Sequence, residues 1–181
     1  MKIFAFAASL RRESINHELL ERVADFARTR DVEFDLARFS EFDMPLYNQD
    51  IQDEQGFPAG AEELKRRVLE CDAMLIASPE YNFSMPGTLK NAVDWLSRFR
   101  PVPLRGKHLL LLSASRSLVG GNRGLWQTRV PFEALGTHVY PDMFSLAAAH
   151  KAWGEDGKLE DAALQERLEA LVTSFIKFAG R

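Results

Sequence analysis

The stretch AMLIASPEYNFSMPG, residues 73–87, joins an apolar run to a polar loop that two prolines stiffen. The run 73–77 is continuously apolar, as expected for a strand that is covered on both faces. After the loop, apolar side chains recur every three to four residues, which predicts a helix over Thr88–Arg98. A buried strand followed by a helix is half of a βαβ unit, from which parallel sheets are built.

The same alternation of strands and helices extends in both directions from this stretch. Apolar runs at 3–7 and 109–112 predict two further buried strands. Residues 32–36 alternate between apolar and polar, which predicts an edge strand with one wetter face. A fifth, weaker strand is expected within His138–Ser145. These segments together predict a five-stranded sheet.

Helical spacing of apolar residues occupies the intervals between the strands and the end of the chain. It is found at 15–26, 64–68, 89–96 and 164–175. A further helix is expected at Arg123–Leu135, although Pro131 lacks an N–H and is expected to kink or end it near Val130. The residues from about Phe39 to Ala59 are expected to form one long loop.

These elements predict an α/β fold: a doubly wound, five-stranded parallel sheet with helices on both faces, in one domain over residues 1–181. Sheets of this kind bind ligands beyond the carboxyl ends of their strands, where the strand order reverses. The loops that follow the apolar runs are therefore the places to look for chemistry.

Composition and charge exclude several classes of function. The 181 residues include 26 acidic and 23 basic ones, so the formal net charge is -3 and no strong positive field is expected to attract nucleic acid or an anionic membrane. No apolar stretch approaches the roughly 20 residues that a membrane-spanning helix needs. No secretory signal pattern is found at the N-terminus, so a cytoplasmic location is expected.

Cysteine usage excludes disulfide scaffolds and cysteine-based metal sites. Cys71 is the only cysteine of the chain, so it has no partner for an internal disulfide or a zinc site. It lies between a helical segment and an apolar run, which favours a passive, partly buried thiol. No metal site is predicted.

The loop after the first strand has the residues of a phosphate site. It leads directly into a helix, whose N-terminus offers unpaired N–H groups and a partial positive charge. Hydroxyl, amide and guanidinium groups gather there; the candidate set is Ser9, Arg11, Ser14, Ile15 and Asn16. The alternative is a well-capped helix with solvated arginines. The glycine patterns of dinucleotide and nucleoside triphosphate loops are missing, so those sites are disfavoured.

The loop after the run 73–77 has the residues of a site for a flat heteroaromatic ring. A rigid turn with exposed N–H groups and aromatic side chains can stack on such a ring and bond to its polar edge. The candidates are Pro79, Glu80, Tyr81, Asn82 and Phe83. The alternative is an ordinary connection in which the two aromatic side chains pack on the sheet.

The loop after the run 109–112 completes the predicted site. Ser113 and Ser115 offer hydroxyl groups, and Gly120 with Gly121 allows close approach of the backbone to a ligand. Three loops at one edge of a sheet favour a ligand that combines a phosphate with an aromatic ring.

These motifs resemble the NADPH-dependent FMN reductase family of flavodoxin-like proteins, which includes quinone, azo-dye and chromate reductases. The matching segments are Ser9-Leu10-Arg11 with Ser14 and Asn16, Met44–Asn48, Pro79–Asn82 through Pro86-Gly87, Leu89–Asn91 with Asp94-Trp95, and Gly120-Gly121 with Arg123. The chain departs from the family pattern at Ala8 and Ser117, where glycine is usual, and at Pro131, where the family's helix runs on.

The resemblance implies an oxidoreductase with bound FMN, with NADPH or NADH as the hydride donor. The acceptor would be a small molecule such as a quinone; an azo dye, chromate and free flavin are further candidates. No catalytic side chain is expected, because the flavin carries the hydride chemistry. A homodimer or homotetramer is implied. The alternatives are a flavodoxin-type electron carrier and a flavin-bound sensor.

Overall fold

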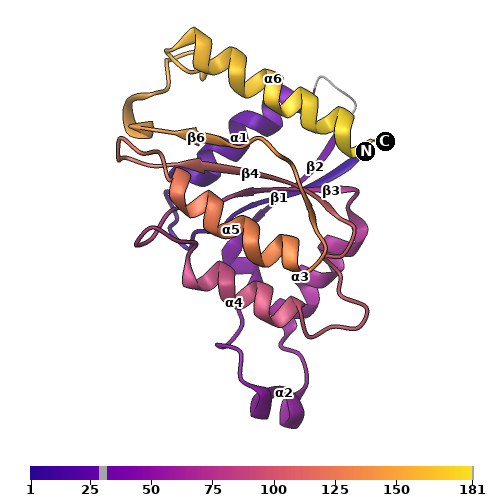
Figure 1. The fold of residues 1–181 in the computed structure, drawn as a ribbon. Helices are drawn as coiled ribbons and strands as arrows, with labels where there is room; N and C mark the ends of the chain where they lie inside the picture. Colours follow the sequence, from indigo (N-terminus) through magenta and orange to yellow (C-terminus); the bar gives the residue numbers. More distant parts are fainter. Residues whose placement is uncertain (29–31, 181) are drawn as a thin grey trace.

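A parallel sheet forms the centre of the protein, and its strands run in the order β2-β1-β3-β4-β5, with the short β6 also paired to β4 (Figure 1). The computed structural model describes residues 1–28 and 32–180. The strands are β1 (Lys2–Ala7), β2 (Glu33–Arg38), β3 (Ala73–Ala77), β4 (His108–Ala114), β5 (His138–Val139) and β6 (Phe144–Leu146). All of their pairings are parallel.

Helices cover both faces of this sheet, so the predicted doubly wound α/β fold is confirmed (Figure 1). The helices are α1 (Ile15–Ala27), α2 (Gln49–Gln55), α3 (Ala59–Glu70), α4 (Gly87–Leu96), α5 (Asn122–Ala134) and α6 (Ala162–Ala179). Helices α1 and α6 pack on one face, and α3, α4 and α5 pack on the other. Two short 3₁₀ helices, η2 (Phe39–Phe42) and η3 (Ala149–Lys151), follow β2 and β6.

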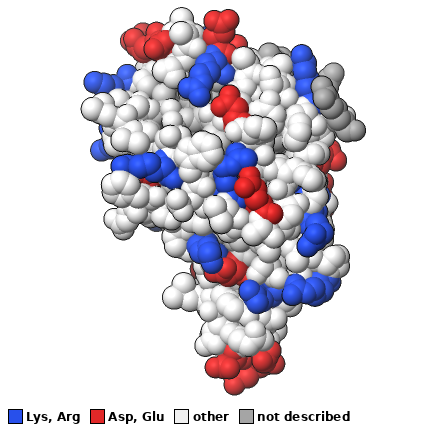
Figure 2. Space-filling view, viewed as in Figure 1, with Lys and Arg blue, Asp and Glu red and all other residues white. Residues whose placement is uncertain are grey.

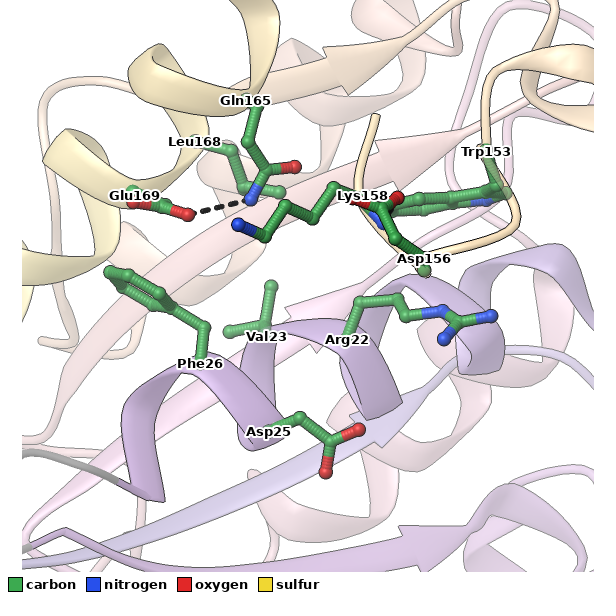
Figure 3. Close-up of a pocket in the computed structure, with 11 residues that line it drawn as sticks. Arg22, Val23, Asp25, Phe26, Trp153, Asp156, Lys158, Gln165, Leu168 and Glu169 are labelled. Atoms are coloured by element: carbon green, nitrogen blue, oxygen red, sulfur yellow. Dashed lines mark hydrogen bonds between the residues drawn. The ribbon is translucent and has the colours of Figure 1, made fainter. Parts of the chain in front are cut away.

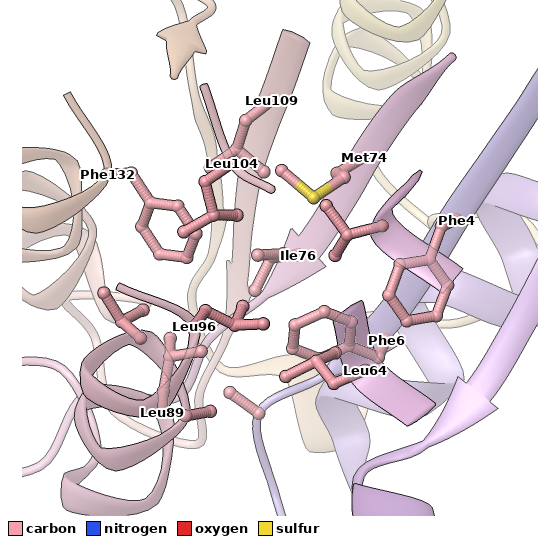
Figure 4. Close-up of a cluster of buried hydrophobic side chains, with 14 of the residues drawn as sticks. Phe4, Phe6, Leu64, Met74, Ile76, Leu89, Leu96, Leu104, Leu109 and Phe132 are labelled. Atoms are coloured by element: carbon pink, nitrogen blue, oxygen red, sulfur yellow. The ribbon is translucent and has the colours of Figure 1, made fainter. Parts of the chain in front are cut away.

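The period-two pattern of the strands divides the core into two layers. Phe4 and Phe6 of β1 lie with Met74 and Ile76 of β3 in the layer under α3, α4 and α5, which Figure 4 shows. The intervening residues of the same strands, such as Ile3 and Leu75, pack under α1 and α6. Burial on both faces explains why these strands are apolar throughout.

The strand order reverses between β1 and β3. From β1 the chain passes outward to β2 and then returns to form β3 on the other side of β1. In folds of this type, ligands bind beyond the carboxyl ends of the two strands between which the order reverses. The predicted edge position of β2 is also confirmed.

The predicted fifth strand is divided into two short strands, β5 and β6, which both pair with β4. Pro141 lies between them and has no N–H to give to the sheet. The N–H of Tyr140 makes the last bond before this break, to Leu109 O at 2.8 Å. The sheet resumes at Phe144, which is fully buried.

Helix α5 runs through Pro131 to Ala134, so the expectation that the helix ends near Val130 is wrong. Pro131 removes one N–H near the end of the helix, and the carbonyl that it would have reached belongs to Gln127, an exposed residue. Leu125 before the proline and Phe132 after it are both buried in the same core layer. Packing on both sides of the proline therefore holds the helix together.

The expected long loop from Phe39 to Ala59 contains two helical segments, η2 and α2. Helix α2 has no buried residue and projects from the rest of the molecule (Figure 1). Its sequence QDIQDEQ lacks an apolar stripe and makes its tip acidic (Figure 2). Without that stripe, the periodicity gave no signal for this helix.

Cys71 is buried more fully than the partly buried thiol that was predicted, and its thiol donates a hydrogen bond to Val68 O at 3.2 Å. Burial raises the pKa of this thiol, which disfavours the reactive thiolate. Cys71 is therefore a passive core residue.

Replacing the proline inside α5 tests the account of that helix. Pro131→Ala restores an N–H and removes a helix-breaking ring, so we expect the free energy of unfolding to rise by about 1–2 kcal/mol, after the added freedom of the unfolded chain is subtracted. Urea unfolding followed by circular dichroism measures the change. Gln127→Ala on the exposed side of the same helix is the control, with an expected change below about 0.5 kcal/mol. Loss of stability in Pro131→Ala would show instead that packing of the proline ring stabilises the helix.

Candidate functional site

Three loops meet at the carboxyl edge of the sheet. The first follows β1, the second follows β3 and the third follows β4. Backbone bonds hold them at one level, because Ala8 N donates to Ala77 O at 2.9 Å and Ser78 N donates to Leu112 O at 2.8 Å. The structure therefore brings together the three loops that the sequence singled out.

The first loop ends on the N-terminus of α1. Ser14 is the N-cap of the helix, and its side chain accepts a hydrogen bond from His17 N at 3.3 Å. The hydroxyl of Ser9 accepts one from Arg11 N at 3.3 Å, which turns the loop back on itself, and Ile15 is the first residue of the helix. Arg11 itself is exposed and forms no ion pair with any residue that the structure describes.

Asn16 lies at the same end of α1, but its side chain is hydrogen-bonded to the backbone of the sheet. Its amide nitrogen donates to Ala114 O at 2.9 Å, and its amide oxygen accepts from Ala114 N at 2.8 Å. This pair of bonds ties α1 to the end of β4. One amide hydrogen of Asn16 is left for a ligand.

A cavity of about 450 Å³ beside the start of α1 is bordered by cationic side chains. Its lining includes Arg11, Arg12, Arg22, Arg38 and Arg116 together with Glu13, Glu18, Glu21, His17 and His150. Arg38, at the end of β2, donates to Arg12 O at 3.0 Å, which places its guanidinium here although it is distant in sequence. The cavity gives a phosphate several charged donors.

The second loop contains a tight turn in a conformation that is rare for these residue types. Tyr81 and Ser84 exchange two backbone hydrogen bonds of 3.0 Å, and Asn82 and Phe83 between them have φ values of 51° and 67°. Two positive φ values in a two-residue connection are typical of a type I′ turn. Asn tolerates this region, whereas Phe in it costs about 1–3 kcal/mol.

The aromatic side chains of this turn point into solvent. Tyr81 is 52% exposed and Phe83 is 63% exposed. The alternative in which they pack on the sheet is therefore wrong. The backbone N–H groups of Glu80, Asn82 and Phe83 donate no hydrogen bond to any described residue, while that of Tyr81 is used within the turn. Three N–H groups of the second loop are therefore available to a ligand.

Glu80 anchors the second loop to helix α5. Its carboxylate accepts a hydrogen bond from Gly124 N at 2.9 Å and lies 2.7 Å from Arg123 Nη2. Burial would raise the pKa of Glu80, but the Gly124 N–H and the Arg123 guanidinium outweigh it and hold the pKa below its usual range. The sequence predicted Glu80 as a ligand-binding residue and did not indicate that its side chain pairs with Arg123 and Gly124 of α5.

The third loop closes tightly over the end of β4. Gly121 has a φ of 85°, and a Cβ there would lie 2.1 Å from Ser113 Oγ, so only glycine fits. Gly120, with a φ of 67°, packs on the backbone of residues 146–147. Ser115 bonds to Ser117 within the loop. The hydroxyl oxygen of Ser113 is buried beneath Gly121 and has no hydrogen-bond partner among the described residues.

The segment Met44–Asn48 is clamped beside these loops. Tyr47 N donates to Asn91 Oδ1 at 2.8 Å, and Trp95 Nε1 donates to Pro45 O at 2.8 Å. A cavity of about 240 Å³ lies between Leu10, Met44 and the start of α4 at Thr88. This cavity extends the carboxyl edge toward η2.

Another cavity, of about 220 Å³, lies between α1 and α6 and is not part of this site (Figure 3). Val23 and Leu168 line it together with Trp153 and the side chain of Lys158. None of the three strand-end loops contributes to it. Among the residues described, no cluster of possible metal ligands was found, and no helix is long and apolar enough to cross a membrane.

A family model described as NADPH-dependent FMN reductase matches residues 1–151. The chain belongs to this family. It is 37% identical over 141 residues to a quinone reductase of Escherichia coli K12, covering 77% of this chain and 75% of the relative. It is 33% identical over 177 residues to an NAD(P)H-dependent FMN reductase of Pseudomonas aeruginosa, covering 94% and 93%.

Similar solved structures agree with the assignment of this chain to the reductase family. FerB of Paracoccus denitrificans, a flavoenzyme NAD(P)H:(acceptor) oxidoreductase, has a TM-score of 0.83 at 27% identity and covers 99% of this chain and 97% of its own. An archaeal flavodoxin has a TM-score of 0.63 at 11% identity, covers 100% of both chains and shows the fold alone. The predicted flavodoxin-like fold, oxidoreductase class and FMN cofactor are confirmed.

The low pKa of Glu80 makes its contribution to stability depend on pH. We expect Glu80→Gln to lower the free energy of unfolding at pH 7 by about 1–2 kcal/mol. The substitution removes the charged carboxylate that accepts hydrogen bonds from Arg123 and from Gly124 N. A carboxylate with a depressed pKa stabilises the fold above its unfolded value of about 4.3 and loses this effect as the pH falls through the folded pKa. The difference between the two proteins should therefore shrink below about pH 4.

Urea unfolding of both proteins between pH 7 and pH 3 measures this effect. Glu133→Gln is the matched control, because Glu133 pairs with Arg129 on the exposed side of α5 and should contribute less than about 1 kcal/mol. A difference that stays constant down to pH 3 would show that the Glu80 charge is not its source.

Proposed function

We propose that the protein transfers a hydride from NAD(P)H, through FMN bound at the carboxyl edge of the sheet, to a small acceptor such as a quinone. This proposal rests on one observation: three loops meet at the carboxyl edge, of which the first offers cationic and hydroxyl groups for a phosphate and the second offers free N–H groups for the edge of a ring. Family membership supplies the cofactor, and relatives named as quinone reductases support the class of acceptor.

The residues present fit FMN. Ser9, Arg11 and Ser14, with the N–H groups that begin α1 at Ile15, suit its phosphate, and Asn16 has one amide hydrogen to add. Pro79 to Phe83 suit its ring, with free N–H groups on Glu80, Asn82 and Phe83. We assign the third loop, with Ser115, Gly120 and Gly121, to the part of the ligand between these two ends, and Ser113 supports this loop from below, because its hydroxyl is buried beneath Gly121.

FMN, when bound, supplies the hydride chemistry, and the protein supplies position, polarity and shielding. The free N–H groups of the second loop would face the polar edge of the ring and favour its reduced, more negative form. The exposed rings of Tyr81 and Phe83, with the cavity beside Leu10 and Met44, would border the place of the donor and the acceptor. No side chain is required to act as a general acid or base.

The electron-carrier alternative is disfavoured by the charges around the site. Electron carriers of the flavodoxin type dock through strongly acidic surfaces, whereas the cavity beside α1 is lined by five arginines and three glutamates and so has an excess of positive charge. Guanidinium groups suit the phosphates of a pyridine nucleotide. Continuous NADPH consumption in the presence of a quinone separates an enzyme from a carrier or a sensor.

We infer that the protein is a homodimer or homotetramer, with α5 at the contact. Trp126 and Val130 on the outer side of α5 are 55% and 64% exposed, and the 63% exposed Phe83 belongs to the loop that packs on the start of the same helix. Large exposed apolar side chains on and beside one helix favour contact with a second copy of the chain. We also propose a cytoplasmic location and a single domain, with no nucleic acid, membrane or metal as partner.

Steady-state kinetics test the proposed reaction. With NADPH and a benzoquinone as the varied substrates, we expect parallel double-reciprocal lines, because donor and acceptor use the same flavin face in turn. NADH in place of NADPH measures the preference between the two donors. Intersecting lines would show that both substrates bind together, and no turnover with FMN bound would contradict the assignment.

The role of Arg11 is tested by its selectivity. We expect Arg11→Ala to weaken FMN about tenfold to a hundredfold, since a hydrogen bond to a charged group contributes roughly 1.5–3 kcal/mol. Riboflavin lacks the phosphate and should change far less. Quenching of flavin fluorescence measures both affinities, with Arg66→Ala on α3 as a control far from the site. Equal losses for FMN and riboflavin would show that Arg11 does not contact the phosphate.

A further inference from the structure

The contacts of Arg123 connect helix α5 to the exposed turn of the second loop. Its Nη2 and Nε lie 2.7 Å and 3.0 Å from Glu80 Oε1. Its guanidinium carbon lies 3.7 Å from the centre of the Phe83 ring, which is stacking distance. A single side chain therefore contacts the residues at both ends of the segment 80–83.

Glu80 makes this contact more rigid than an ordinary surface ion pair. Its side chain is only 10% exposed, and its second oxygen accepts the N–H of Gly124 at 2.9 Å. A Cβ at Gly124 would lie 3.0 Å from Glu80 Cβ and 3.1 Å from Ser84 O, so the loop packs closely on the helix. Arg123, Glu80 and the start of α5 form one bracket around the turn.

The bracket supports a backbone conformation that the residue types do not favour. Asn82 and Phe83 both have positive φ, and an aromatic residue rarely adopts that region by itself. The Phe83 side chain has little other support, because it is 63% exposed. The Arg123 guanidinium stacked on its ring is the contact that favours this conformation.

We propose that Arg123 is a positioning residue, which holds the turn at 81–84 so that the free N–H groups of Glu80, Asn82 and Phe83 meet the edge of the flavin ring. This inference rests on the proposed function. Arg123 acts through the turn and not through the phosphate, so its loss should affect FMN and riboflavin equally, unlike the loss of Arg11.

Arg123→Ala and Arg123→Lys test this role, with Arg66→Ala as the control. We expect Arg123→Ala to weaken FMN and riboflavin by the same factor, about threefold to tenfold, because the lost bonds involve a charged but partly exposed group. The midpoint potential of the bound flavin should become more negative, because the misplaced N–H groups stabilise the reduced ring less. Arg123→Lys keeps the charge opposite Glu80 but not the planar stack, so it should give intermediate values.

Limited digestion of the flavin-free protein with chymotrypsin provides a readout that needs no cofactor. Tyr81 and Phe83 are exposed cleavage sites, and we expect cleavage there to be faster in Arg123→Ala than in the unmutated protein and Arg66→Ala. Thermal unfolding of each flavin-free variant shows whether it is folded; if Arg123→Ala is not, Arg123→Lys carries the comparison.

Unchanged affinities, potential and cleavage rate in a folded variant would overturn the role of Arg123 and leave the proposed function intact. Loss of affinity for FMN alone would assign Arg123 to the phosphate and would also overturn it. Failure of the unmutated protein to bind any flavin would overturn the proposed function and this role with it.

Discussion

The carboxyl ends of the three central strands lie in register, because Ala7 pairs with Ala77 and Ala77 pairs with Leu112. This alignment puts three loops at one level of the sheet, where the strand order reverses. The loops that we propose for a phosphate and for a ring come from distant parts of the sequence and lie at this one edge. The buried layers on both faces keep the strands, and therefore the loops, in place.

Most of the fold could be predicted because the signals are local. Continuous apolar runs marked β1, β3 and β4, and helical periodicity marked the helices that bury an apolar face. Helix α2 buries no residue, so periodicity gave no sign of it. The continuation of α5 through Pro131 depends on tertiary packing on both sides of the proline. The division of the last strand follows from the missing N–H of Pro141, and sequence periodicity does not show where pairing with β4 resumes.

For the site, the sequence indicated which loops lie at the carboxyl edge, but it did not indicate which residues their side chains hydrogen-bond to. The loops after β1, β3 and β4 were predicted from their hydroxyl, aromatic and glycine residues, and the structure brings them together. The commitment of Asn16 to Ala114, and of Glu80 to Arg123, joins residues 98 and 43 positions apart. Such pairings follow from the crossovers of the fold and leave no short-range pattern.

The proposed function requires one flavin at the carboxyl edge, with its ring against the free N–H groups of the second loop. Titration of FMN into ¹⁵N-labelled, flavin-free protein, followed by amide chemical shifts, locates the bound flavin. We expect saturation at one FMN per chain, with the largest shifts at Glu80, Asn82, Phe83 and the first turn of α1. Shifts confined to the residues around the cavity between α1 and α6, or no saturable shifts at all, would contradict it.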